Sequence, residues 1–175
     1  MTHKHPEDLP VTEYYRLNGV NFTYCWRAGC TSIASLALNA GAEILSDPPE
    51  TCILLLKEPM SRFASAWCIL PDGLQRREEG NVIARQSIED YTDGVLDDVE
   101  GVRSPHCWRQ LEQHSDVKHL VLYRLEGTTH IAGTELLHLN ETEEPKPELT
   151  HRVDELREFY ADDIKHWEQA TVWKQ

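Results

Sequence analysis

The sequence predicts an α/β fold with three layers, in which a mainly parallel central sheet is flanked by helices. Short apolar runs alternate with amphipathic helical patterns along the chain, as in domains built from strand–helix–strand units. The run Thr51 to Glu58, "TCILLLKE", is continuous and too short for a helix, which is typical of a strand covered on both faces. Glycine and proline follow two of these runs, where strands are expected to turn into helices.

Each element has its own pattern. Strands are expected over Val20–Trp26, Thr51–Glu58 and His119–Glu126. Pro59 suits the first turn of a helix, and Phe63 and Trp67 lie four residues apart on one face of it. Further helices are expected over Thr31–Ala40, Ile88–Val99, Pro105–His114 and Thr150–Gln169, a charged mobile loop over 73–87, and a polar linker over Asn140–Glu148.

The length of 175 residues suits one domain with a substantial core, and we see no internal repeat. We place the domain at residues 19–175, after a polar N-terminal tail over residues 1–18. That tail has no apolar stretch of signal-peptide length, and no window approaches the roughly 18 apolar residues of a membrane span. These features predict a cytoplasmic protein.

Charge and cysteine content exclude several classes of function. The formal net charge of −13 opposes broad affinity for nucleic acid or for an anionic membrane, although it permits a local pocket for one small anion. The five cysteines form no C-x-x-C pair and lie mostly in apolar runs. We therefore expect reduced, mostly buried thiols and no structural zinc.

The stretch "NFTYCWRAGCTSIASLAL", residues 21–38, combines a strand end with features of an anion site. The first turn of a helix presents unpaired N–H groups and a partial positive charge. Gly29 lets the backbone approach a phosphate, Thr31 and Ser32 supply hydroxyl donors, and Arg27 supplies a fork of N–H groups. An ordinary capped helix explains the same stretch equally well when it is taken alone.

A second joint of this kind follows in "ILLLKEPMSRFASAW". Lys57 ends the predicted buried strand, and Arg62 and Ser65 lie on the helix after Pro59. This is a second strand-to-helix joint suited to an anion, in a protein that is otherwise acidic.

The two joints resemble motifs of the sulfotransferase family. "WRAGCTSI" is similar to the family's 5′-phosphosulfate loop, Pro-Lys-x-Gly-x-Thr-Ser, and "LLLKEPMSRFASAW" is similar to its 3′-phosphate motif, an Arg-Asp-Pro segment followed by Arg and Ser-Ala-Tyr. Downstream, "SPHCWRQ" resembles the His-Trp-Arg-Pro-Gln stretch of the chondroitin- and dermatan-type branch. "LLHLNETEEP" and "LREFYADDIKHW" resemble that branch's closing pattern, a His-x-Asn-x-Thr segment and a helix with Tyr-x-x-Asp.

The resemblance implies a P-loop-type domain that moves a sulfuryl group from 3′-phosphoadenosine 5′-phosphosulfate (PAPS) to a hydroxyl or amine, with a carbohydrate as a candidate acceptor and without a metal. After the transfer, the donor becomes 3′,5′-adenosine bisphosphate (PAP). The 5′-phosphosulfate would be held by Arg27, Ala28, Gly29, Cys30, Thr31 and Ser32, and the 3′-phosphate by Lys57, Arg62 and Ser65. Arg27 stands where the family has a catalytic lysine, so its role would be electrostatic, because a guanidinium stays protonated at neutral pH.

The sequence leaves two questions open: which residue is the catalytic base, and whether the chain catalyses the transfer at all. His106 in "SPHCWRQ" is the preferred base, with the carboxylates Glu43, Asp47 and Glu50 as alternatives. The replacements at residues 27 and 57 and the short chain leave a second hypothesis, a PAPS- or PAP-binding protein of the same fold that does no chemistry. A kinase-like phosphoryl transferase is disfavoured, because the sequence has no Walker lysine and no obvious aspartate for Mg²⁺.

Overall fold

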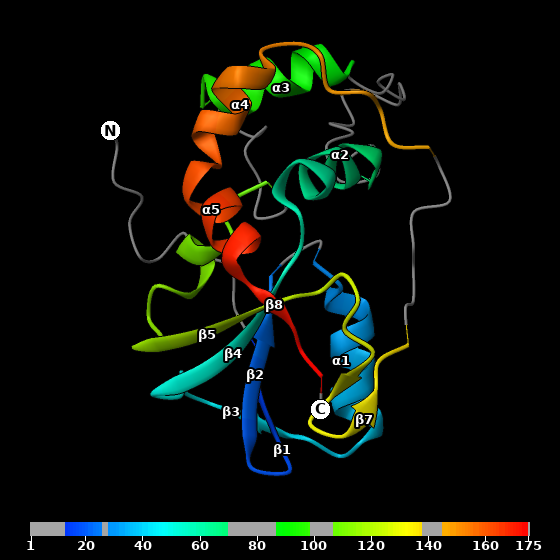
Figure 1. Ribbon diagram of the computed structural model, residues 1–175, viewed down its shortest axis with the longest axis vertical. Helices are drawn as coiled ribbons and strands as arrows, with labels where there is room; N and C mark the ends of the chain where they lie inside the picture. Colours follow the sequence, from blue (N-terminus) through cyan, green and yellow to red (C-terminus); the bar gives the residue numbers. More distant parts are fainter. Residues whose placement is uncertain (1–12, 26–27, 70–86, 99–106, 138–144, 175) are drawn as a thin grey trace, which may run out of the picture.

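The computed structural model describes residues 13–25, 28–69, 87–98, 107–137 and 145–174. Its centre is a sheet of six strands in the order β3-β1-β2-β4-β5-β8 (Figure 1). The strands are β1 (Tyr14–Leu17), β2 (Val20–Tyr24), β3 (Glu43–Leu45), β4 (Thr51–Leu56), β5 (His119–Arg124) and β8 (Thr171–Val172). The last four in spatial order, β2, β4, β5 and β8, run parallel, whereas β1 is antiparallel to both β2 and β3. The expected α/β class with a mainly parallel sheet is therefore confirmed.

Strand β4 lies in the middle of the parallel part, which explains its continuous apolar sequence. It pairs with β2 on one side and with β5 on the other, and Leu54, Leu55 and Leu56 are all buried. Because these side chains alternate between the two faces, both faces must be covered.

One face of the sheet is covered by the helix α1 (Cys30–Asn39), whose Ile33, Leu36 and Ala37 join the main hydrophobic core with Phe22 and Leu55. A small hairpin, β6 (His130–Ile131) and β7 (Thr134–Glu135), lies on the same side as α1 (Figure 1). The other face is covered by the 3₁₀ helix η3 (Leu111–His114) and by α5 (Ala161–Gln169).

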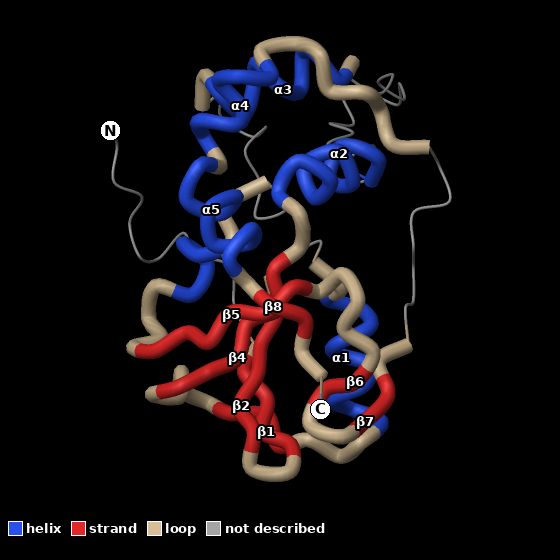
Figure 2. Tube along the Cα trace, in the orientation of Figure 1, coloured by secondary structure: helices blue, strands red, loops and turns tan. Residues whose placement is uncertain are grey.

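The remaining helices gather beyond the carboxyl ends of the parallel strands (Figure 2). These are α2 (Pro59–Ile69), α3 (Ile88–Leu96) and α4 (Val153–Phe159), with the first turn of α5. They share a second hydrophobic core made by Phe63, Tyr91, Val95, Cys107, Leu156 and Tyr160. This helical cluster therefore lies beyond the ends of β2, β4 and β5 (Figure 2).

Three expectations need correction. Strand β1 spans Tyr14–Leu17, so these residues belong to the sheet and not to an N-terminal tail. The single long helix expected over Thr150–Gln169 is two helices, α4 and α5, that meet at Tyr160. Of the helix expected over Pro105–His114, the described part is a turn followed by η3.

The other expected elements were placed well, with bounds shifted by a few residues at most. Residues 73–86 of the predicted loop and residues 140–144 of the polar linker lie outside the described residues, and Ser87 caps the start of α3. Within the part of the chain that the structure describes, no helix has both the length and the apolar character needed to cross a membrane.

Candidate functional site

The candidate site lies at the carboxyl edge of the sheet, where β2, β4 and β5 end side by side. Because the three strands are parallel neighbours, the residues that follow them, Cys25, Lys57 and Leu125, come to one edge. In open α/β sheets this edge is where ligands bind. The described parts of the two strand-to-helix joints predicted from the sequence therefore lie next to each other in space.

The first joint turns from β2 into α1 through Gly29. Its φ of 72° is left-handed, and a Cβ built there would lie 3.0 Å from Leu125 Cδ2. Glycine is required for both reasons, since it alone adopts this conformation without strain and has no side chain to meet Leu125. The loop thus brings backbone close to the end of β5.

The first turn of α1 has no acidic residue and no side-chain cap. Thr31 is exposed, Cys30 is half-buried, and Ala28 and Ser32 are buried. The hydroxyl at the surface is that of Thr31, and Ser32 lies beneath it. Arg27 lies outside the described residues. The residues present suit an anion at the helix start, where the N–H groups and the helix dipole point outward.

The second joint brings Lys57 and Ser65 together. Lys57 Nζ donates a hydrogen bond to Ser65 Oγ at 3.1 Å, and Ser65 Oγ donates to the carbonyl oxygen of Ser61 at 2.8 Å. An ammonium and a hydroxyl from the end of β4 and from α2 thus form one polar group at the carboxyl edge, as the resemblance expects for a 3′-phosphate.

Glu58, which follows Lys57 in the chain, caps the start of α2. Its carboxylate accepts hydrogen bonds from the backbone N–H groups of Met60 and Ser61, and its carbonyl accepts from Arg62 N at 2.9 Å. Pro59 occupies the first helical position, where its missing N–H costs nothing. The first N–H groups of α2 are therefore satisfied within the protein, and an anion beside α2 would depend on side chains.

Arg62 does not join Lys57 and Ser65 as expected. Its side chain is fully buried, and Nη1 donates to the carbonyl oxygen of Trp108 at 2.7 Å. A group with no exposed surface cannot touch a nucleotide bound at the edge. Arg62 instead stabilises the segment around residue 108, and its buried position argues against a role as a phosphate ligand.

That segment also holds Lys57 in place. The side-chain amide of Gln110 accepts from Lys57 N at 2.9 Å and donates to Lys57 O at 2.8 Å, so it continues the sheet pairing beyond the end of β4. Asp163 of α5 in turn accepts from the backbone N–H groups of Gln110, at 2.6 Å, and Leu111, at 3.2 Å. Tyr160 donates to the carbonyl of Cys107.

Residues from three of the resembling segments thus form one buried network around Lys57. Burial raises the pKa of Asp163, while the two backbone N–H groups act in the opposite direction. The Tyr-x-x-Asp pattern of the last segment is explained by this contact, since Tyr160 and Asp163 both hold residues 107–111.

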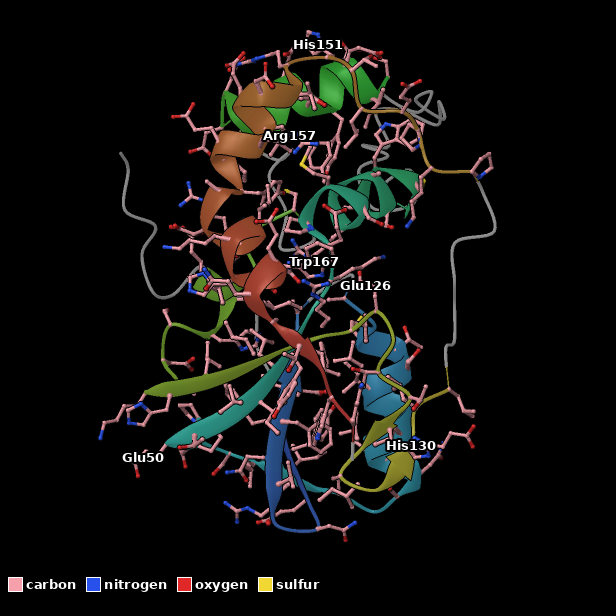
Figure 3. The ribbon with its side chains drawn as sticks, in the orientation of Figure 1. Glu50, Glu126, His130, His151, Arg157 and Trp167 are labelled. Carbon is pink, nitrogen blue, oxygen red and sulfur yellow. The ribbon has the colours of Figure 1, made fainter. Side chains whose placement is uncertain are left out.

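The end of β5 carries a third polar group (Figure 3). Glu126 accepts from the backbone N–H of Glu58 at 2.9 Å and from Trp167 Nε1 at 3.0 Å. The guanidinium of Arg124 stacks 4.4 Å from the Trp167 ring centroid and donates to the carbonyls of Trp167 and Glu168. These contacts fix the C-terminal turn of α5 at the edge of the sheet.

The proposed carboxylate bases lie away from this edge. Glu50 precedes β4 and pairs with Lys118 at 2.9 Å, so it lies at the amino ends of the strands, opposite to Glu126 (Figure 3). Glu43 pairs with Arg16 at 3.4 Å on the antiparallel side of the sheet, and Asp47 is exposed in the loop between β3 and β4. None of the three can serve a site at the carboxyl edge. His106 lies outside the described residues.

Buried thiol and imidazole groups lie directly beneath the site. Cys25 Sγ lies 3.4 Å from the carbonyl oxygen of Gln110 and 3.5 Å from His114 Nε2. Burial raises the pKa of the Cys25 thiol and lowers the pKa of His114 to about 4. Both groups are therefore neutral at pH 7 and act as core, which agrees with the expected reduced and buried thiols.

Sequence reasoning missed two residues of the site, Gln110 and Glu126. A signal existed for Glu126, because it ends an apolar strand just as Lys57 does. Gln110 ends the segment "SPHCWRQ", but its contact with Lys57 joins two distant parts of the chain and no local pattern reveals it.

The comparisons with known proteins give no relative for this chain: no family model, no curated protein and no solved structure matches it. Within the described residues, no group of three or more histidine, cysteine, aspartate or glutamate side chains is arranged to hold a metal ion.

Proposed function

We propose that this chain is a sulfotransferase of P-loop type that binds PAPS at the carboxyl edge of its sheet and moves the sulfuryl group to a hydroxyl or amine. A carbohydrate is the acceptor class that the sequence resemblance favours. The observation that carries the proposal is the Lys57–Ser65 pair, which lies at the end of β4 beside the Gly29 joint at the end of β2. Two separate anion-binding groups on adjacent strands match a ligand with phosphate groups at two positions.

The residues of the site divide between the two ends of such a ligand. Gly29 permits close approach of the backbone, and Cys30, Thr31 and Ser32 supply the helix start to the 5′-phosphosulfate. Lys57 and Ser65 hold the 3′-phosphate as a point charge and a hydroxyl donor. Arg27 takes the place of the family's lysine and neutralises charge on the leaving phosphate.

PAPS supplies an activated sulfuryl group, whose bond to the 5′-phosphate oxygen breaks while a bond from sulfur to the acceptor oxygen or nitrogen forms. The acceptor's proton passes to a base, for which His106 is the proposed residue. The chain's own task is to hold donor and acceptor in line and to stabilise the charge on the leaving phosphate.

Two nucleotides that differ only in the 3′-phosphate test the nucleotide-binding part of the proposal. We expect Lys57→Ala and Ser65→Ala each to weaken PAP binding by about tenfold or more, because each removes a hydrogen bond with a charged partner. Binding of adenosine 5′-monophosphate, which lacks the 3′-phosphate, should change little. Isothermal titration calorimetry without Mg²⁺ measures both affinities.

Lys118→Ala is the matched control, because Lys118 is exposed at the opposite end of the sheet. Equal losses for both nucleotides would remove Lys57 and Ser65 from a 3′-phosphate site. Turnover of labelled PAPS against a panel of sugars and phenols then tests the chemistry. Nucleotide binding without turnover on any acceptor would favour the protein that binds PAPS without catalysis.

A further inference from the structure

A second lysine reaches the helix that carries Ser65. The chain from residue 145 passes α2 on its way to α4 (Figure 1), and Lys146 Nζ donates to Ser61 Oγ at 2.6 Å. Lys146 is exposed and lies within a polar segment between two prolines. This contact joins α2 to a part of the chain 85 residues away.

The Lys57 and Lys146 contacts form one continuous set along α2. Ser61 and Ser65 are four residues apart and therefore lie on the same side of the helix. Lys57 Nζ bonds to Ser65 Oγ at 3.1 Å, Ser65 Oγ to the Ser61 carbonyl at 2.8 Å, and Ser61 Oγ to Lys146 Nζ at 2.6 Å. Two ammonium groups and two hydroxyls thus line one turn of α2.

The charge distribution at this turn favours an anion. Lys57 and Lys146 each donate to a neutral hydroxyl, and among the described residues no carboxylate lies within 4.0 Å of Lys146 Nζ. The adjacent carboxylate, Glu58, accepts from the N–H groups of Met60 and Ser61. In a protein with net charge −13, two cations brought to one helical turn form a local positive patch.

We propose that Ser61 and Lys146 complete the 3′-phosphate subsite, so that a phosphate monoester is bound between Lys57 and Lys146 on this turn of α2. The inference rests on the proposed function for the identity of the ligand, a 3′-phosphorylated adenine nucleotide. A phosphate monoester carries close to two negative charges at pH 7 and three acceptor oxygens, which matches two ammonium groups and two hydroxyls. Both lysine side chains have flexible four-carbon stems and can close on the ligand.

The segment that carries Lys146 would then be held in place by the bound phosphate. Residues 145–152 connect Lys146 to α4, so binding at Lys146 would hold this segment against α2. We therefore expect PAP to protect the Lys146 ammonium from acetylation, whereas the exposed Lys165 of α5 should be labelled equally with and without PAP.

Calorimetry with PAP and adenosine 5′-monophosphate tests the subsite. Lys146→Ala should weaken PAP binding by about tenfold and leave the affinity for adenosine 5′-monophosphate unchanged. Lys146→Arg should restore most of the loss, and Ser61→Ala should lose several-fold. Lys165→Ala is the matched control and should bind both nucleotides like the native chain.

The outcomes separate this inference from the proposed function. If Lys57→Ala loses discrimination for the 3′-phosphate and Lys146→Ala does not, the subsite is overturned and the proposed function stands. If the native chain binds neither nucleotide, the proposed function fails, and acetylation in the presence of inorganic phosphate decides the subsite. Protection of Lys146 by phosphate then supports an anion site, whereas unchanged labelling of Lys146 overturns it.

Discussion

At the scale of single residues, Gly29 shows how one position serves both the fold and the site. Its left-handed φ of 72° and its contact with Leu125 are separate constraints. Gly41 provides a natural comparison, because its φ of 71° is the same and a Cβ there would meet no atom within 4 Å. The two glycines therefore separate backbone strain from close packing.

We expect Gly41→Ala to lower the free energy of unfolding by about 1–2 kcal/mol, the cost of a left-handed non-glycine residue. Gly29→Ala should cost more, because its Cβ also forces the buried Leu125 side chain to move. Urea denaturation of the two variants measures the difference. Equal losses would mean that Leu125 yields freely and that only the backbone conformation requires Gly29.

His114 gives a prediction about pH. Its folded pKa of about 4 lies below the ordinary value of 6.5, because burial disfavours the charged imidazolium. The unfolded chain therefore binds a proton between pH 6.5 and 4 that the folded chain does not. The stability is complete above pH 6.5 and falls as the pH decreases towards 4, by about 3 kcal/mol in total.

His114→Phe keeps a ring beside Tyr14 and removes this titration. Its stability should depend less on pH between 6.5 and 4 than that of the native chain, whatever its stability at pH 7. Urea midpoints measured every half pH unit would show the change, and parallel curves for His114→Phe and the native chain would contradict it.

At the scale of elements, the sequence was informative where local pattern and final environment agree. The apolar run of β4 and the proline at the start of α2 have local causes, burial on both faces and a preset φ. Strands β1, β3 and β8 were missed because they are short, and β3 and β8 also lie at the edges of the sheet and contain no buried residue. Their pairing depends on neighbours that come from other parts of the chain.

The two wrongly predicted helices share a physical cause. Around residue 108, Arg62 binds the carbonyl of Trp108, and Asp163 binds the N–H groups of Gln110 and Leu111. In a helix, each of these backbone groups would instead pair with a residue four positions away along the chain. The break between α4 and α5 likewise falls at Tyr160, whose hydroxyl is bound to the carbonyl of Cys107. Distant side chains decided both cases, and no local pattern reveals them.

The candidate site was predictable to a similar degree. The joints at Gly29 and Lys57 could be read from the sequence, because strand, turn and helix follow each other directly. The inward position of Arg62 and the contact of Lys146 with Ser61 could not, since each depends on how segments far apart in the chain pack together.

At the scale of the whole molecule, the helical cluster and the sheet are joined through residues 107–111. Asp163 of α5 binds the N–H groups of Gln110 and Leu111, and the Gln110 amide binds both backbone groups of Lys57 at the end of β4. The position of a candidate ligand-binding lysine therefore depends on a carboxylate in the C-terminal helix. This connection makes a test of long-range order possible.

Asp163→Asn is the variant that tests it. An amide offers one acceptor oxygen where the carboxylate offers two, so one of the two buried N–H groups loses its partner. We expect the free energy of unfolding to fall by about 1–3 kcal/mol. Asp162→Asn, on the exposed side of the same turn, should change it little.

Hydrogen exchange then shows whether the effect reaches the site. The Lys57 amide donates to Gln110 Oε1 at 2.9 Å, so its exchange rate reports directly on the hydrogen bond between Lys57 and Gln110. In Asp163→Asn, the Lys57 amide should lose more protection than the amides inside β4, which remain paired with the neighbouring strands. Uniform loss across β4 and Lys57 would mean that Asp163 stabilises the fold as a whole. Only selective loss at Lys57 would show that α5 positions the edge of the sheet through Gln110.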